Sequence, residues 1–379
     1  MIYLDNAATT YPKPVAVWDA VDYCQRNYAV NVGRGSYPTA LYAAECVEET
    51  RTLLAAMVKA SCPDNVVLTS SATIAANEII FGLPWDSYKT VYVSPFEHNA
   101  IARPLQAICD RFGIEMKMIP FDGVSQAWDE DETTRLFELD PPDYVFINHV
   151  SNVTGAILPL DGMTEKAKEY GAIVIVDASQ SMGLLEYNLQ KQMIDYLIFA
   201  GHKNLYASWG IGGFIANNTV IRPALYGGTG SDSLNLSMSD SFPIGYEPGS
   251  PNTIAISSLK ASLTWLNEIG IQSIFNKKKQ LMKMLVDGIS NEKVQLYLPA
   301  DTAKHTSVIS FNVDDYEPNE VGMILGNDYD IAVRTGYHCA PFVHRLIDTE
   351  KISGTVRASI GFFNTEEDIK ALIQALAEL

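Results

Sequence analysis

The chain has 379 residues, of which 47% are hydrophobic and 19% are charged. These fractions are typical of globular proteins and exclude a disordered chain, and the length predicts about two domains. Because 45 Asp and Glu residues outnumber 27 Lys and Arg residues, the net charge is −18, which disfavours binding to nucleic acid or to an anionic membrane surface.

The first two thirds of the chain alternate between short apolar stretches and helical patterns. The apolar stretches are rich in β-branched and aromatic residues and predict strands at 66–70, 90–94, 144–148, 172–177 and 196–200. Between them, 73–82 and 99–112 have helical periodicity. Continuous apolar strands joined by helices predict an α/β fold with a mostly parallel central sheet that is covered on both faces.

The pattern changes after about residue 250. Residues 256–290 predict long helices, 306–313, 331–335 and 355–360 predict strands, and 365–379 predict an amphipathic helix. We expect a large domain over 15–250 and a smaller α+β domain over 251–379, which the first segment, 1–14, joins. No Pro-rich or Ser-rich linker marks the boundary, so it falls somewhere in 245–260.

The cysteines and the first residues favour the cytoplasm. The cysteines are odd in number, form no CxxC pair and are widely scattered: Cys24, Cys46, Cys62, Cys109 and Cys339. This pattern argues against a disulfide framework and a zinc site. The start, MIYLDNAATT, lacks a signal-peptide pattern, and no apolar run reaches the roughly 18 residues of a membrane span.

Chemically active side chains follow the ends of the predicted strands. In an open parallel sheet, ligands bind beyond the carboxyl ends of the strands. The residues found there are Ser71, Ala72 and Thr73, then His98, Asn152, Asp177, Gln180, His202 and Lys203. Each has an ordinary structural alternative: Ser71, Thr73 and His98 could begin helices, Asp177 could belong to a turn, and Lys203 could lie on the surface.

Taken together, this set fits pyridoxal phosphate. That cofactor needs a lysine for its Schiff base and an acid that keeps its pyridine nitrogen protonated. It also needs a phosphate cradle, which a helix start supplies. Lys203, Asp177 and the turn at 71–73 meet these needs. The competing cofactor, a dinucleotide, is disfavoured because no GxGxxG follows an early strand, and a P-loop is also absent.

At this point the chain resembles a known family nearly from end to end. The motifs that carry the resemblance are YLDNAATT at 3–10, SSAT at 70–73, EHNA at 97–100, HVSNVTGAI at 149–157, VDASQS at 176–181, AGHK at 200–203, GGTG at 227–230, PGSPN at 248–252, RTGYHCAP at 334–341 and VRASIGFFNT at 356–365. In this order they resemble the cysteine desulfurase and selenocysteine lyase family, of the short-loop kind, which has the class V aminotransferase fold.

The resemblance implies a fold-type I homodimer with pyridoxal phosphate on Lys203. It implies that Asp177 pairs with the pyridine nitrogen and that His98 stacks on the ring. Asn152 and Gln180 would lie near the phenolic oxygen. The phosphate would contact Ala72, Thr73 and His202, together with Thr229 of the other subunit. Substrate binding would fall to Arg357, which clamps the carboxylate, with Asn152 and Arg334. The sequence departs from the family at Ala200, where Ser or Thr is usual, and at Tyr337, where His is frequent.

Cys339 is the candidate nucleophile, in the loop Arg334–Pro341. A thiolate attacks sulfur, and nearby positive charge, here from Arg334 or His338, favours the thiolate. The alternative is a buried structural cysteine, which is our expectation for Cys46 and Cys109. The expected reaction converts L-cysteine to L-alanine: Lys203 moves the α-proton, Cys339 takes the sulfur as a persulfide, and an acceptor protein receives it.

Four other functions remain open. The same cofactor could serve a selenocysteine lyase, or a cysteine or cystine C–S lyase that works by β-elimination and does not need Cys339. An ordinary transaminase would leave the loop around Cys339 without a role. A catalytically inactive sulfur-relay scaffold is disfavoured by the presence of Lys203, Asp177 and Arg357.

Overall fold

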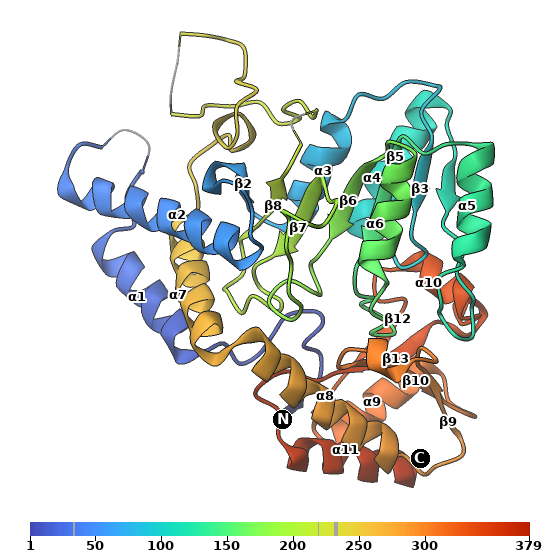
Figure 1. The fold of residues 1–379 in the computed structure, drawn as a ribbon. Helices are drawn as coiled ribbons and strands as arrows, with labels where there is room; N and C mark the ends of the chain where they lie inside the picture. The colour runs from blue at the N-terminus through green and yellow to red at the C-terminus, as the bar shows by residue number, and fades with distance from the viewer. Residues whose placement is uncertain (33–34, 219, 231–233) are drawn as a thin grey trace.

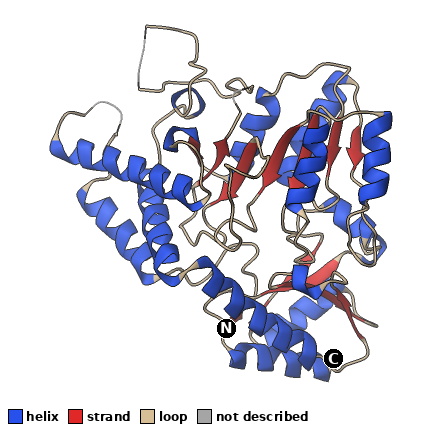
Figure 2. Ribbon diagram, viewed as in Figure 1, coloured by secondary structure: helices blue, strands red, loops and turns tan. Residues whose placement is uncertain are grey.

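The structure is a computed structural model that describes residues 1–32, 35–218, 220–230 and 234–379. Across these ranges the principal sheet has seven strands (Figures 1 and 2). Their order is β2 (Val66–Thr69), β8 (Gly212–Ala216), β7 (Tyr196–Ala200), β6 (Ile173–Asp177), β5 (Tyr144–Asn148), β3 (Val91–Val93) and β4 (Met116–Met118). Only β8 runs antiparallel to its neighbours, so the predicted α/β fold with a mostly parallel sheet is confirmed.

All five strands predicted for this sheet form, but β4 and β8 were missed. β8 begins with two glycines, which weaken the strand signal in the sequence. Their lack of a side chain is required, because a Cβ on Gly213 would lie 2.1 Å from the carbonyl oxygen of Val67. β4 has the sequence MKM and pairs with β3 alone, at the end of the sheet.

Helices cover both faces of this sheet (Figure 2). Along β5, Tyr144 and Phe146 join one apolar cluster, whereas Val145 and Ile147 join another. The first cluster includes residues of α3 (Ala72–Gly82) and α4 (Asn99–Phe112). The second includes residues of α2 (Pro38–Met57), α5 (Glu130–Leu139), α6 (Leu160–Glu169) and α7 (Thr253–Ile269), and α1 (Val15–Asn27) packs against α7. This two-sided burial explains why the strands read as continuous apolar runs.

The C-terminal part forms a separate antiparallel sheet. Its strands lie in the order β12 (Arg334–Gly336), β13 (Thr355–Ser359), β10 (Val308–Val313) and β9 (Val294–Tyr297). Its helices are α8 (Ile271–Gly288), α9 (Pro318–Asp328), α10 (Pro341–Leu346) and α11 (Glu366–Glu378). The prediction of one strand over 331–335 is wrong: β11 (Ile331–Ala332) pairs instead with β1 (Ile2–Tyr3) from the N-terminus. A partner more than 300 residues away divides this segment between two sheets.

The N-terminal segment lies against the C-terminal sheet (Figure 1). Leu4 belongs to the apolar cluster formed by α8, α9, α11 and that sheet, and Asp5 bridges Ser359. In contrast, α7 packs on α1 and α2 beside the principal sheet. The domain boundaries given above stay a prediction. Among the described residues, we find no helix with the length and apolar character that a membrane span requires.

Candidate active site

Strands β6 and β7 bring the two central candidates together. Asp177 is the last residue of β6, and Lys203 lies three residues beyond the end of β7. Burial is the main cause that lowers the pKa of Lys203. Arg357 and Arg334 lower it further, whereas Asp177 and Cys339 raise it. These groups are therefore close enough to act on one another. A lowered pKa favours the neutral amine, which is the form that attacks a carbonyl carbon.

The turn that carries Lys203 is held by the N-terminal segment. The carbonyl oxygen of His202 accepts hydrogen bonds from Thr9 Oγ1 (2.9 Å), the Thr10 amide (3.1 Å) and Lys13 Nζ (2.7 Å). Thr10 Oγ1 also donates to the carbonyl oxygen of Lys203 at 3.0 Å. We assigned no role to these residues from the sequence, although the motif at 3–10 contains two of them. The contacts fix the backbone of Lys203.

Asp177 is buried, and its carboxylate accepts the amide hydrogen of Ser179 at 2.8 Å. It also lies opposite Asn148 of β5 in the sheet register. A buried carboxylate at a strand end can pair with a cationic nitrogen of a ligand. A role as a turn residue alone would account for the contact of Asp177 with Ser179. It would not account for the effect of Asp177 on the pKa of Lys203.

We expect Asp177→Asn to retain the fold and to lose about 10²–10³ of the catalytic rate. The amide oxygen can still accept from Ser179, but an amide has no charge with which to stabilise a pyridinium. The measurement is the turnover rate of cofactor-loaded protein, with the melting temperature as the control for folding. A rate close to that of the unchanged protein would leave Asp177 with only its turn contact.

His98 is a neutral ring that begins α4. Its Nδ1 accepts the amide hydrogen of Ala100 at 3.0 Å, which leaves the ring proton on Nε2. Burial is the main cause that lowers the pKa of His98 to about 4, and Lys203 contributes. Protonation of Nδ1 would also break the helix cap. His98 therefore presents an uncharged, flat ring at neutral pH, which suits a stacking role.

The start of α3 and the ring of His202 offer donors for an anion. Ser71 caps α3 by accepting from the Ile74 amide at 3.3 Å, so its ordinary structural role is present. The next amides, of Ala72 and Thr73, belong to the first turn, whose N–H groups are free of helix partners and favour anions. His202 Nδ1 is buried and has no partner among the described residues. Its ring stacks on Trp209 at 4.1 Å.

Asn152 and Gln180 make contacts that the sequence did not predict. Asn152 Nδ2 donates to the carbonyl oxygen of His338 at 2.7 Å, and Asn152 Oδ1 is buried without a partner in the described part of the chain. Gln180 Nε2 donates to the carbonyl oxygen of Ala7 at 2.8 Å. Their position near a phenolic oxygen stays a prediction.

The loop around Cys339 is held in an unusual backbone conformation. His338 and Cys339 both have positive φ, 48° and 59°, which is uncommon for residues with a side chain. Asn152 holds the carbonyl oxygen of His338, and the Asn99 amide donates to that of Cys339 at 2.7 Å. The start of α4, next to His98, is thus attached directly to the loop. Such strain at a loop is a mark of functional sites.

Of the two cations expected beside Cys339, only Arg334 takes that position. Arg334 Nη2 lies 3.3 Å from Cys339 Sγ. The expectation for His338 is wrong: its pKa is well below the usual value, mainly because the ring is buried and secondly because of Arg357. Its Nε2 instead contacts the carbonyl oxygen and Oγ1 of Thr355, both at 3.0 Å. His338 is therefore a neutral residue that anchors the loop to β13.

Arg357 lies in β13 directly opposite Arg334 of β12. It is only 1% exposed; Nη2 pairs with Asp5 Oδ1 at 2.6 Å, and Nη1 donates to the carbonyl oxygen of Asn152 at 2.9 Å. Nε is buried without a partner among the described residues. Asp5, which the sequence reasoning missed, orients the guanidinium. The unpaired N–H of Arg357 and the neighbouring Arg334 make this position suitable for a carboxylate.

The remaining predicted residues lie in different surroundings. Cys24, Cys46 and Cys109 are buried in helices, and burial raises the pKa of Cys109 to about 11, as expected for inert thiols. Cys62 is partly exposed. Thr229 lines a cavity of about 700 Å³ with Ser70 and Ile74, at the start of α3.

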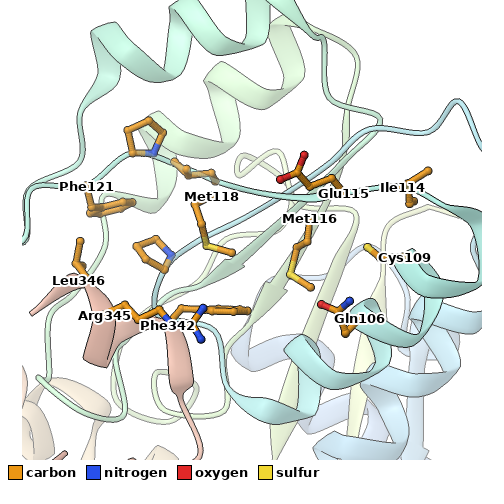
Figure 3. Close-up of a pocket in the computed structure, with 13 residues that line it drawn as sticks. Gln106, Cys109, Ile114, Glu115, Met116, Met118, Phe121, Phe342, Arg345 and Leu346 are labelled. Carbon is orange, nitrogen blue, oxygen red and sulfur yellow. The ribbon is translucent and has the colours of Figure 1, made fainter. Parts of the chain in front are cut away.

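A second cavity lies beside α10, the helix that follows the Cys339 loop (Figure 3). Its volume is about 730 Å³, and it is lined by α4, β4 and α10, including Met116, Met118 and Phe342. None of the predicted site residues lines it. We therefore place the candidate site at the rim around Lys203 and not in this cavity.

The residues around Lys203 fit pyridoxal phosphate. A half-buried lysine with a lowered pKa, a buried carboxylate and a neutral flat ring converge: Asp177 acts on the pKa of Lys203, and both Lys203 and Asp177 act on the pKa of His98. The unpartnered His202 Nδ1 and the first amides of α3 supply donors for a phosphate. A Cβ on Gly212 would lie 2.6 Å from the Ala72 amide nitrogen, so a glycine there keeps this cradle open.

Comparison with known proteins identifies the family of this chain. A probable cysteine desulfurase from Pyrococcus abyssi is 32% identical over 100% of this chain and 94% of that protein. A cysteine desulfurase from Salmonella agona is 29% identical over 100% of this chain and 93% of its own length. The apo structure of a cysteine desulfurase from Thermococcus onnurineus superimposes with a TM-score of 0.92 at 30% identity, covering 100% of this chain and 94% of that one. The model of the class-V aminotransferase family matches residues 2–372, and the chain belongs to that family.

Proposed function

We propose that the protein is a pyridoxal phosphate-dependent cysteine desulfurase, which converts L-cysteine to L-alanine and takes the sulfur onto Cys339. The observation that carries this proposal is the Arg334–Cys339 contact of 3.3 Å, with both residues acting on the pKa of the half-buried Lys203. A cation beside a thiol favours the thiolate, which is the nucleophile. The relatives named above as cysteine desulfurases support the same reaction.

The bound cofactor would supply an electron sink for the bonds around the substrate's Cα. Lys203 would hold it covalently, Asp177 would keep its ring nitrogen protonated, and His98 would lie on its face. Ala72, Thr73 and His202 would hold the phosphate through N–H groups. Asn152 and Gln180 are the candidates for its phenolic oxygen.

The chain's own residues then account for binding, proton transfer and sulfur transfer. Arg357 would bind the substrate carboxylate, oriented by Asp5. Lys203, as a neutral amine, would take the proton from Cα and later return one to the product side. The Cys339 thiolate would attack the substrate sulfur, so that an S–S bond forms as the Cβ–S bond breaks and its electron pair stays on carbon. Arg334 would stabilise the anionic sulfur throughout.

The alternatives differ in their need for Cys339. A C–S lyase that works by β-elimination releases the sulfur without a protein thiol, and a transaminase does not touch it. The strained, anchored loop and the Arg334 contact favour a role for this thiol. Selenocysteine is the alternative substrate, because the same groups would bind either amino acid.

Quantifying alanine and sulfide from L-cysteine, with and without a reductant, tests the proposal. A desulfurase gives one alanine per sulfur, and sulfide appears in solution only when a reductant releases it from Cys339. Pyruvate in place of alanine would contradict the proposal and indicate β-elimination. Turnover of L-selenocysteine, measured in parallel, compares the two substrates.

Arg357→Ala should raise the KM for L-cysteine by about 100-fold, because two charge-assisted hydrogen bonds to the carboxylate are lost. Arg357→Lys should fall between this variant and the unchanged protein, since it keeps the charge but not the paired geometry. Steady-state kinetics provides the measurement, and melting temperatures control for the loss of the Asp5 contact. An unchanged KM with a lower kcat would mean that Arg357 does not bind the carboxylate.

The assembly and partners expected from the sequence belong to this proposal. A homodimer in which Thr229 reaches the partner's cofactor is supported by exposed apolar side chains in the same region, including Leu234 and Leu236. A sulfur-acceptor protein would take the persulfide from Cys339. A cytoplasmic location, and a large domain at 15–250 with a smaller one at 251–379 plus 1–14, complete the proposal.

A further inference from the structure

A buried lysine outside the site just described occupies a position where an apolar residue is expected. The buried face of α8 contains Ile274, Lys278, Leu281, Met282 and Leu285, at the spacing of a helix side that packs on a core. Lys278 is 4% exposed, in the middle of this stripe. A buried amine costs folding free energy unless it is paired, so its presence calls for a reason.

Lys278 begins a chain of hydrogen bonds that leads to the Lys203 turn. Lys278 Nζ donates to Asn204 Oδ1 at 2.9 Å, and Asn204 follows Lys203 directly in the sequence. Asn204 Nδ2 donates to the carbonyl oxygen of Gln180 at 2.6 Å, and Gln180 Nε2 donates to the carbonyl oxygen of Ala7 at 2.8 Å. These hydrogen bonds therefore connect α8, the Lys203 turn, the loop after β6 and the N-terminal segment.

The two hydrogen-bond partners of the Asn204 amide, Lys278 and the Gln180 carbonyl oxygen, fix the orientation of this amide. A backbone carbonyl can only accept a hydrogen bond, and the lysine amine donates one in either protonation state. Asn204 must therefore direct its oxygen to Lys278 and its nitrogen to Gln180, and both of its polar atoms are used. Asn204 and Gln180 are 6% and 4% exposed, so bulk water does not reach either contact.

Among the described residues that line the cavity beside Lys278, there is no compensating carboxylate. Lys278 lines a small cavity of about 10 Å³, room for about one water molecule, with Asn6, Gln180, Asn204, Thr306 and Ser307 among the neighbours; apart from Lys278 none of the lining residues is charged. Burial is the cause that lowers the pKa of Lys278 to about 7. The protein thus retains a costly amine for the sake of a polar contact.

We propose that Lys278 is a positioning residue for the active site: through Asn204, it holds the turn that carries Lys203 against the loop that carries Gln180. This inference rests on the proposed function, in which Lys203 binds the cofactor. Lys278 does not touch the reacting atoms and acts only through Asn204. Helix α8, from the C-terminal part of the chain, thereby contributes to the geometry of a site at the edge of the principal sheet.

The test compares Lys278→Met with Lys283→Met, which changes an exposed lysine five residues further along α8. Apo protein is titrated with pyridoxal phosphate, reduced with borohydride, and the fraction of modified Lys203 peptide is measured by mass spectrometry. For Lys278→Met, we expect the concentration for half-modification to rise about tenfold, which corresponds to one hydrogen bond from a charged donor. Lys283→Met should match the unchanged protein. Equal loading of folded Lys278→Met would overturn the inference.

The pH dependence of unfolding tests whether the amine is buried as described. Because the pKa of Lys278 falls from 10.5 when unfolded to about 7 when folded, its burial opposes folding fully below pH 7, and this effect disappears as the pH rises toward 10.5. The urea midpoint of Lys278→Met, relative to the unchanged protein, should therefore be higher at pH 6 than at pH 9. A difference that is constant with pH would contradict the burial of this amine.

A second variant keeps the inference open to refutation if Lys278→Met does not fold. Asn204→Asp gives the amine a carboxylate partner, so folding should persist, but it removes the donor to Gln180. The pyridoxal phosphate concentration for half-modification of Lys203 should again rise about tenfold. A concentration equal to that of the unchanged protein would reject the role of these hydrogen bonds. If the unchanged protein itself forms no borohydride-stable adduct at Lys203, the proposed function fails, and the role of Lys278 fails with it.

Discussion

Lys203→Ala should remove all measurable turnover of L-cysteine and all covalent attachment of pyridoxal phosphate. The lysine is expected to act twice, as the residue that holds the cofactor and as the base that moves the proton at Cα. Loss of general base catalysis alone costs about 10²–10⁴ in rate. Among the described lysines, Lys203 is the one whose pKa is influenced by both Asp177 and Cys339. Alanine production, visible absorbance and borohydride trapping provide three independent measurements.

Lys191→Ala is the matched control for this experiment, since Lys191 is an exposed lysine in a loop of the same chain. It should retain absorbance, trapping and activity. The assignment of Lys203 would have to be withdrawn if Lys203→Ala were still yellow, reducible by borohydride and active. The same result would remove the basis for the roles of Asp177 and His98, which we infer from their coupling to this lysine.

Cys339→Ala should abolish alanine formation from L-cysteine while the cofactor stays attached to Lys203. Thr10 and its neighbours hold the backbone of Lys203 through hydrogen bonds that do not involve the Cys339 thiol. The substitution should therefore leave Lys203 in place. Without the thiolate, the substrate sulfur has no acceptor. Mass spectrometry of the unchanged protein after brief exposure to L-cysteine should find one added sulfur on the peptide that contains Cys339.

Cys62→Ala is the control for Cys339, because Cys62 is the other cysteine that is not fully buried. It should keep full activity. Turnover of L-selenocysteine by Cys339→Ala could persist in part, since selenium leaves carbon more readily than sulfur. Normal conversion of cysteine to alanine by Cys339→Ala, or a persulfide found on another cysteine alone, would rule out the desulfurase mechanism and favour the lyase alternatives.

The sequence by itself determined the class of fold and predicted the residues of the candidate site. Five strands could be predicted because a parallel sheet buried on both faces demands continuous β-branched and aromatic runs, which few other structures need. The polar residues after these strands indicated a ligand rim, because parallel strands end at one edge. Lys203, Asp177 and His98 were predicted in this way, and in the structure Asp177 influences the pKa values of both Lys203 and His98.

Only the tertiary structure decided how residues from distant segments meet. Asp5 and Arg357 form an ion pair although 352 positions separate them in the sequence. Strands β11 and β12 belong to different sheets because β11 pairs with β1. No local pattern encodes such partners. Likewise, Arg334 and His338 both looked cationic beside Cys339, but burial makes His338 neutral, and burial depends on what packs around the ring. The role of Lys278 is the clearest case: its helix pattern shows only an interrupted apolar stripe, and its contact with Asn204 exists because the fold places α8 beside the Lys203 turn.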